Sequence, residues 1–216
     1  MPAIKQPQPN QVLVEGNDDL HVITNLIEKR GIYTREQLDQ ITLKSCGSDS
    51  KLLKQAEELI KIPDQYERIA IIIDADTSPE RRRQDLKKRL EKVSVTLPDS
   101  PDPNGFIGES QDDGKKVGIW MMPDNDSPGG LEDFLQPMVP NNDACWLYTE
   151  ECVDTASKIG ARFQPQQRLK ARLHTFLAWG NPPGRPYGMS IAHGYLNHQT
   201  PLADKFCDWF QKLFSI

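Results

Sequence analysis

Along residues 10–140, short apolar runs alternate with segments in which apolar residues recur every three or four positions. The apolar runs predict strands, and the three-to-four periodicity predicts amphipathic helices. We expect strands at 11–14, 41–43, 68–74 and 117–122, and helices at 18–30, at 52–60, after Ser78-Pro79 and from Leu131. Alternating strands and helices are typical of a parallel sheet joined by crossover helices. The pattern therefore predicts an α/β fold with a mostly parallel sheet flanked by helices.

The segment 68–74 is the clearest strand of the chain. Its residues from Ile69 to Ile73 are all apolar, with no polar residue between them. A strand with one solvated face alternates between apolar and polar residues, whereas a strand covered on both faces is continuously apolar. We therefore expect this strand at the centre of the sheet.

Beyond residue 140 the pattern is mainly helical. Helices are expected at 144–159, 165–179 and 202–214, with a turn-rich loop at 180–188. A proline-rich excursion at 97–116 interrupts the first part of the chain and contains one short expected strand, 105–108. A length of 216 residues fits one domain. We expect a single domain, 1–216, with an α/β core at about 10–140 and a C-terminal helical elaboration at about 141–216.

Charge and composition narrow the expected location and partners. The formal net charge of −5 argues against bulk attraction to nucleic acid, although local basic clusters such as the arginines at 81–83 can still hold phosphates. No apolar run approaches the ~20 residues that span a bilayer. The polar residues 1–10 do not resemble a signal peptide. The four cysteines are expected to be free thiols, as is usual in a reducing compartment. We therefore expect a cytoplasmic protein without a membrane partner.

Acidic residues stand directly after two of the expected strands. Glu15 follows the first strand, and Asp74 and Asp76 follow the segment of isoleucines. The carboxyl ends of parallel strands meet at one edge of the sheet, where open α/β proteins bind ligands. Carboxylates gathered there repel one another unless a cation neutralises them, and hard cations such as Mg²⁺ prefer oxygen ligands. The sequence therefore predicts a divalent metal site at this edge.

Further acids are expected near the same edge. Asp19 stands four residues after Glu15, in the first turn of a helix. Asp74 and Asp76 are two residues apart, so on an extended backbone their side chains point the same way. Glu132 follows the strand at 117–122 and is either a supplementary ligand or an ordinary acid at a helix N-terminus. The other acids of that group are Asp124, Asp126 and Asp133.

These motifs resemble a known domain. The order Val14-Glu15-Gly16-x-x-Asp19, followed by Ile-Ile-Asp74-x-Asp76, is similar to the Toprim domain of topoisomerases, bacterial primases, recombination-mediator proteins and OLD-type nucleases. The resemblance covers about residues 10–135, and the spacing of Glu15 and Asp19 is closest to the OLD-type branch. The segments 117–125 and 130–134 also resemble a group of stand-alone Toprim-related prokaryotic proteins that are known more by fold than by activity.

The resemblance implies a Toprim/Rossmann-like sheet and a role for each acid. Glu15 would act in general acid/base catalysis or ligate a metal, and Asp74 and Asp76 would hold Mg²⁺ or Mn²⁺. Asp19 would help to complete a second metal position. The implied activity is metal-dependent phosphodiester chemistry on nucleic acid. Because the chain has no Walker A glycine loop, the ATPase of an OLD-type nuclease would have to be a separate partner protein.

Two alternatives remain open at this stage. The chain can be a non-catalytic metal- or nucleotide-binding module of the Toprim fold that acts through a partner chain. It can also carry out phosphoryl transfer on a small phosphate ester, which its acidic net charge permits. Arg185, in the proline-rich loop near 180–188, is a candidate for binding the phosphate of a substrate. The sequence does not decide the oligomeric state.

Overall fold

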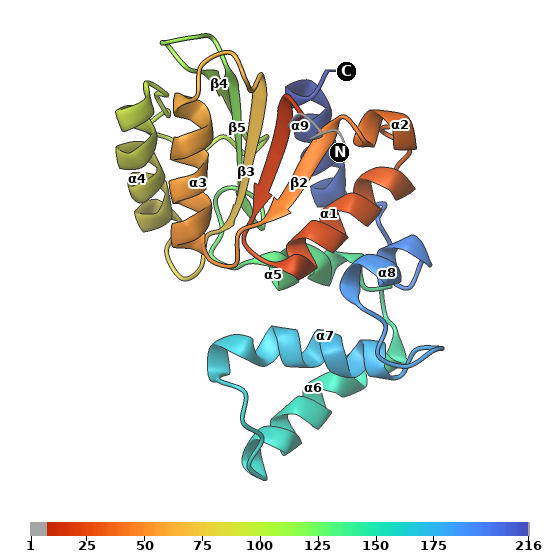
Figure 1. Ribbon diagram of the computed structural model, residues 1–216. Helices are drawn as coiled ribbons and strands as arrows, with labels where there is room; N and C mark the ends of the chain where they lie inside the picture. Colours follow the sequence, from red (N-terminus) through yellow and green to blue (C-terminus); the bar gives the residue numbers. More distant parts are fainter. Residues whose placement is uncertain (1–7, 216) are drawn as a thin grey trace, which may run out of the picture.

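The centre of the molecule is a five-stranded sheet with the strand order β2-β1-β3-β5-β4 (Figure 1). The computed structural model describes residues 8–215. The residues 1–7, on which the expectation about a signal peptide largely rests, lie outside this described part. Four strands are parallel, and β4 pairs with β5 in the antiparallel direction. The strands are β1 (Asn10–Val14), β2 (Ile41–Ser45), β3 (Arg68–Asp74), β4 (Phe106–Glu109) and β5 (Lys116–Met122).

Helices cover both faces of the sheet, which confirms the predicted α/β fold. Alternate residues of β3 enter two separate cores: Ala70 and Ile72 belong to one, and Ile69, Ile71 and Ile73 to the other. The continuous apolar run of this strand therefore has the expected cause, burial on both sides. The helices of the first face are α1 (Asn17–Lys29), α5 (Leu131–Leu135) and α9 (Pro201–Leu213), and those of the second face are α3 (Asp49–Lys61) and α4 (Pro79–Leu90).

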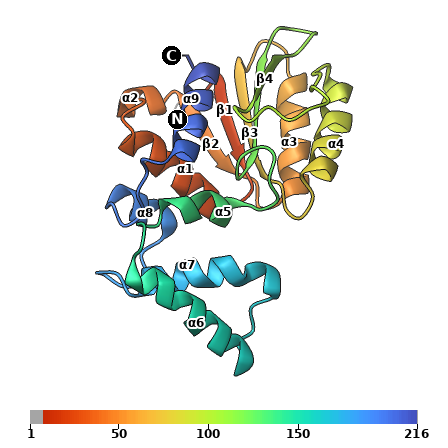
Figure 2. The same cartoon turned by 180° about the vertical axis from the view of Figure 1, so that it is seen from behind.

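The chain changes direction across the sheet between β1 and β3. From β1 it passes through α1 to β2, and then returns through α3 to β3 on the other side of β1. The two crossover helices lie on opposite faces of the sheet (Figures 1 and 2). The space beyond the carboxyl ends of β1 and β3 is thus the topological switch point, the usual ligand position in open α/β sheets.

A helical hairpin projects from the carboxyl end of the sheet (Figures 1 and 2). It consists of α6 (Ala144–Lys158) and α7 (Arg168–Ala178). The short 3-10 helix η3 (Pro165–Gln167) lies between them and leads directly into α7. We call the segment 144–178 the arm. Leu173 and Leu177 of α7 are buried in the core on the α1 face of the sheet, so the arm is anchored through α7.

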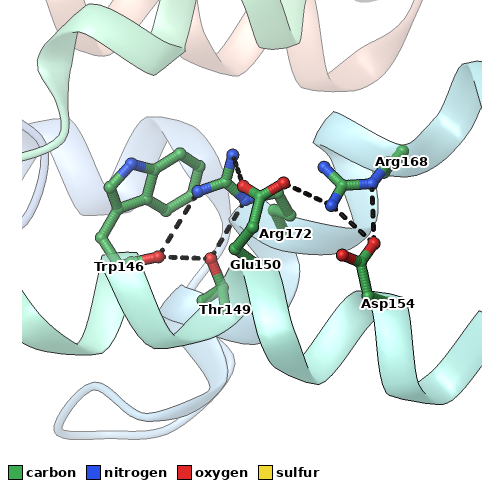
Figure 3. Close-up of polar contacts among 6 residues, drawn as sticks. All are labelled: Trp146, Thr149, Glu150, Asp154, Arg168 and Arg172. Atoms are coloured by element: carbon green, nitrogen blue, oxygen red, sulfur yellow. Dashed lines mark hydrogen bonds and ion pairs between the residues drawn. The ribbon is translucent and has the colours of Figure 1, made fainter.

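Two arginines of α7 hold α6 in place (Figure 3). Arg172 pairs with Glu150 at 2.6 Å, donates to the Thr149 hydroxyl at 3.2 Å, and lies 4.1 Å from the centroid of the Trp146 ring. Arg168 pairs with Glu150 and also with Asp154 at 2.7 Å. Because α6 buries only Thr149 and Val153, these polar contacts carry much of its attachment.

The last helix belongs to the sheet packing, although it lies in the segment expected as a C-terminal elaboration. Phe206, Trp209, Phe210 and Leu213 of α9 are buried in the core on the α1 face. The Trp209 indole donates to the carbonyl of Phe106 in β4 at 2.9 Å. The end of the chain therefore completes the cover over β4 and β5.

The remaining elements are short. Two helices were not expected from the sequence, α2 (Arg35–Leu38) and α8 (Tyr187–Ala192), as helices of this length depend on tertiary packing rather than on periodicity. The 3-10 helices η1 (Glu91–Val93) and η2 (Gln136–Met138) extend α4 and α5. The four cysteines are free, as expected. Of the helices in residues 8–215, none has the length and apolar content to cross a bilayer.

Candidate metal centre

Glu15 connects the ends of the two strands at the switch point. It directly follows β1, and its Oε1 accepts a hydrogen bond from the backbone N–H of Asp74, the last residue of β3, at 3.0 Å. Burial raises the pKa of the Glu15 carboxyl, against the effects of this hydrogen bond and of the Arg82 charge, which lower it. The predicted acid of the first motif therefore lies next to the first acid of the second motif.

Asp74 is the most strongly perturbed carboxyl of the site. Its side chain lies against Gly130 at the start of α5: a Cβ atom at Gly130 would be only 2.5 Å from Asp74 Oδ2. Burial, followed by the charges of Asp19 and Glu15, raises the pKa of Asp74 from 3.8 to about 8. Glu132 and Asp76 also contribute to this shift. The five acids expected from the sequence therefore act on one another at one edge of the sheet.

Asp19 lies in the first turn of α1, where it is 9% exposed. Its Oδ2 accepts from the backbone N–H of Gly16 at 3.0 Å, which caps the start of the helix. Burial raises the pKa of Asp19 to about 6, and the negative charge of Glu132 adds to this effect. Within residues 8–215, no lysine or arginine forms an ion pair with Asp19 or Asp74.

Glu132 occupies the first turn of α5 and faces the same acids. Its carboxylate forms an ion pair with Lys170 of α7 at 2.9 Å, and its side chain is 18% exposed. Both readings of Glu132 offered by the sequence are therefore compatible with its position, because it lies at a helix N-terminus and also beside Asp19 and Asp74.

Asp76 departs from the expected geometry. The strand ends at Asp74, and Asp76 has a positive φ of 54°, so the assumption of an extended backbone through both residues is wrong. The Asp76 carboxylate turns to Arg82 of α4, which also binds Asp49 at 2.9 Å. With 65% of its side chain exposed, Asp76 lies at the rim of the acidic edge. We use the term acidic edge for Glu15, Asp19, Asp74, Asp76 and Glu132.

The other acids after β5 have local roles. The Asp124 carboxylate accepts from the backbone N–H and hydroxyl of Ser127, both at 2.7 Å, and closes a turn. Asp133 accepts from the backbone N–H of Gly130 at 2.9 Å and caps α5. Of the acidic group that follows this strand, Glu132 is thus the member directed to the other carboxylates.

The donor atoms of the acidic edge fit a hard divalent cation such as Mg²⁺ or Mn²⁺, because all are carboxylate oxygens. Their present spacing does not form a closed set of ligands: within the described residues, no three acids, histidines or cysteines are grouped closely enough to hold a metal. Lys170 holds Glu132 and Arg82 holds Asp76, while Glu15 and Asp19 accept backbone N–H groups. A bound cation would therefore have to replace at least the ammonium group of Lys170 beside Glu132.

Arg185, the expected phosphate-binding residue, makes its contacts elsewhere. Its guanidinium lies 5.0 Å from the centroid of the Tyr195 ring and donates to the carbonyl of Asn181 at 3.2 Å. These partners belong to the segment around its own loop. The structure thus gives Arg185 a role in holding this loop and does not bring it to the acidic edge.

Residues from α7 and α8 that sequence reasoning did not select complete the surroundings. Lys170 contacts Glu132, and the ring of Tyr187 stacks on His174, with 4.9 Å between the ring centroids. Burial and the charges of Glu132 and Asp18 raise the pKa of Tyr187. The sequence signal for these positions is weak, because the arm returns to the sheet edge from a distant part of the chain.

Comparison with known proteins gives one match. The family model described as "Protein of unknown function (DUF3226)" matches residues 9–215. No curated protein and no solved structure matches the chain significantly. The family description assigns no activity, so the function has to be inferred from the chemistry of the acidic edge.

Proposed function

We propose that this chain, which belongs to the DUF3226 family of proteins of unknown function, binds Mg²⁺ or Mn²⁺ at its acidic edge and cleaves phosphodiester bonds in nucleic acid. The observation that carries the proposal is the gathering of Glu15, Asp19 and Glu132 around Asp74 at the switch point, where burial, followed by the charges of these acids, raises the pKa of Asp74 to about 8. Such mutual repulsion is relieved by a divalent cation, and this position is where α/β sheets bind ligands.

The choice of reaction rests on the chemistry of the edge and on its resemblance to Toprim motifs. A bound divalent cation would neutralise charge on a scissile phosphate and lower the pKa of an attacking water. Glu15 is the candidate to accept a proton, since burial already raises its pKa. Lys170 pairs with Glu132 and Arg82 pairs with Asp76, so both cations border the carboxylates and can attract the phosphate oxygens.

A polynucleotide is favoured over a small phosphate ester by a basic hollow along α4 and η1. A hollow beside Asp76 is lined by Arg81 and Arg82 but also by three acids, Asp49, Asp76 and Asp85. The basic hollow adjoins it through Asp49, Arg82 and Asp85 and continues along α4 and η1 with Lys88, Arg89 and Lys92. A basic track of this kind follows a phosphate backbone independently of base sequence. Because the net charge of the whole chain is −5, binding would depend on this local track and on the cation.

The test is cleavage of plasmid, single-stranded DNA and RNA with Mg²⁺ or Mn²⁺. The wild type should cut at least one of these, and Asp74→Ala and Glu15→Ala should each lose the activity. Asp126→Asn is the matched control, because this acid follows β5 but is 70% exposed and lies near Arg83. Cleavage that survives both alanine variants would come from a contaminant and would refute the proposal.

A second function is favoured by the spacing of the carboxylates. Since no ligand group within residues 8–215 is already closed, the chain can instead be a non-catalytic metal- or nucleotide-binding module that acts through a partner chain such as an ATPase. The same samples separate the two functions. A metal-dependent rise in melting temperature without cleavage of any of the three substrates would favour the binding module.

A further inference from the structure

The hydroxyl group of Tyr187 is buried without a hydrogen-bond partner. The residue is 2% exposed, and its hydroxyl group makes no hydrogen bond to any of the described residues. Buried polar groups are nearly always paired, because an unpaired one loses its bonds to water without replacement. An orphaned hydroxyl beside a candidate site is therefore a sign that it has a partner in another state of the protein.

Tyr187 is held firmly in this position. It opens α8, which packs tightly on α1: a Cβ atom at Gly188 would be 2.4 Å from the carbonyl oxygen of His21. The Tyr187 ring stacks on His174 of α7. Both contacts fix the ring, so the hydroxyl cannot swing away to find water. His21 stands two residues after Asp19 in α1, and His174 stands one turn after Lys170, which pairs with Glu132, so these contacts place Tyr187 on the side of the acidic edge.

Glu132 is the group that would change partner when a cation binds. In the structure Glu132 forms an ion pair with the ammonium group of Lys170, whose side chain is 45% exposed and can move outward. A divalent cation among the carboxylates would repel this ammonium group. Glu132 would then lose its ion-pair partner at the moment when it must be oriented as a ligand, and ligating carboxylates are usually held by outer hydrogen bonds.

We propose that Tyr187 is the positioning residue of the metal site, and that its hydroxyl donates a hydrogen bond to Glu132 when this carboxylate turns to a divalent cation. The inference rests on the proposed function, because it assumes a cation at the acidic edge. It adds a residue outside the acidic motifs and links α8 to the site. The acceptor is unpaired as well: Glu132 Oε1 lies 2.9 Å from the Lys170 ammonium group but makes no hydrogen bond.

Tyr187→Phe removes only the hydroxyl and tests the proposal in two ways. In the titration of the protein with MnCl₂ by calorimetry, we expect about 10–100-fold weaker binding, the usual effect of losing such an outer hydrogen bond. The melting temperature without metal should stay the same or rise, because the hydroxyl has no partner to lose in that state.

Tyr33→Phe is the matched control. The Tyr33 hydroxyl is also buried but donates to the carbonyl of Phe214 at 2.7 Å. This variant should melt at a lower temperature than the wild type and should bind Mn²⁺ with unchanged affinity. A combined variant, Tyr187→Phe with Glu132→Gln, should bind Mn²⁺ no more weakly than Glu132→Gln alone, because the hydroxyl acts through the Glu132 carboxylate.

The outcomes separate the inference from the proposed function. If the wild type binds Mn²⁺ and Tyr187→Phe binds it equally well, the inference fails and the metal site stands. A lower melting temperature of metal-free Tyr187→Phe would show that the hydroxyl is already paired, which also overturns the inference alone. Absence of Mn²⁺ binding to the wild type would overturn both.

Discussion

The Glu15 carboxylate accepts a hydrogen bond from the backbone N–H of Asp74, and this 3.0 Å contact joins the carboxyl ends of β1 and β3. The bond uses one oxygen of Glu15 but none of the carboxylate oxygens of Asp74. The Asp74 side chain is instead directed to Gly130, where it meets the charges of the other acids. Two acids 59 residues apart in sequence thus become neighbours through the sheet. Of the two, Asp74 experiences the stronger repulsion from the other acids.

Replacing Asp74 by asparagine should abolish metal binding without unfolding the protein. At a 100-fold excess of Mn²⁺ over its Kd, binding to the wild type stabilises the fold by about 2.7 kcal/mol, which corresponds to a rise of about 5–10 °C in melting temperature for a chain of this size. Asp74→Asn should show no such rise. Asp126→Asn should respond as the wild type does, and a full metal-dependent shift in Asp74→Asn would exclude this carboxylate as a ligand.

The stability of the metal-free protein should fall as the pH rises. The pKa of Asp74 rises from 3.8 to about 8 on folding, and that of Asp19 to about 6, so the folded state binds more protons than the unfolded state between these values. The contribution of these two carboxyls to the free energy of unfolding is therefore complete below pH 3.8. It is lost as the pH rises through about 6 for Asp19 and through about 8 for Asp74. The slope reaches ~1.4 kcal/mol per pH unit for each proton.

Urea denaturation at several pH values in the presence of a chelator measures this dependence. Between pH 6 and about 8, the free energy of unfolding of Asp74→Asn should depend less on pH than that of the wild type, because the asparagine amide does not titrate. In the opposite direction, Mn²⁺ should bind the wild type more tightly as the pH rises, because cation and proton compete for Asp74. An equal slope in both proteins would contradict the assignment of this proton to Asp74.

The sheet and its acidic edge could be predicted from the sequence because both depend on local patterns. The apolar run of β3 indicated a strand buried on both faces. Because β1 and β3 pair in parallel, the acids that follow them lie at the same edge of the sheet. The position of Asp76 could not be predicted in the same way. Its positive φ arises where the chain leaves the strand, and its backbone pairs with Gly129 from another loop.

The Lys170 ammonium group and the Tyr187 hydroxyl near the acidic edge could not be predicted either. Lys170 and Tyr187 reach it only because α7 and α8 return across the carboxyl end of the sheet, and no periodicity in the chain encodes that return. Arg185 illustrates the opposite case. Its loop has the composition expected of a phosphate-binding segment, but the guanidinium is used on Tyr195 within the same region.

Gly130 should be essential for the position of the Asp74 carboxylate. A Cβ atom there would lie 2.5 Å from Asp74 Oδ2, so Gly130→Ala must displace this side chain. We expect a loss of ~1–3 kcal/mol in stability, as for other overpacked sites, together with loss of the Mn²⁺-dependent rise in melting temperature. Gly180→Ala is the control, since its nearest atom would be 3.3 Å away. Normal metal binding by Gly130→Ala would show that Asp74 is not held at this position.

Removing Lys170 should favour the cation. Lys170→Ala leaves Glu132 without its ammonium partner, so the metal-free protein should lose ~0.5–1 kcal/mol, as expected for a partly exposed pair. Because a cation then has no competitor for Glu132, we expect about tenfold tighter binding of Mn²⁺, equivalent to about 1.4 kcal/mol. Calorimetric titration measures the change, with Lys158→Ala on the arm as the control. Weaker binding would mean that Lys170 does not compete with the metal.

Arg172 should control the attachment of α6 to the rest of the molecule. Its side chain is 12% exposed and combines the ion pair to Glu150 with the bond to Thr149 and the contact with the Trp146 ring, so Arg172→Ala should cost ~2 kcal/mol locally. Arg168 is 35% exposed and lacks the ring contact, so Arg168→Ala should cost less.

Hydrogen exchange followed by mass spectrometry measures this attachment. Exchange in α6 should be fastest in Arg172→Ala, slower in Arg168→Ala and slowest in the wild type, with unchanged exchange in β1 and β3. The exposed Arg162→Ala serves as the control. Equal exchange in all four proteins would mean that apolar contacts of α6, and not these arginines, hold the arm.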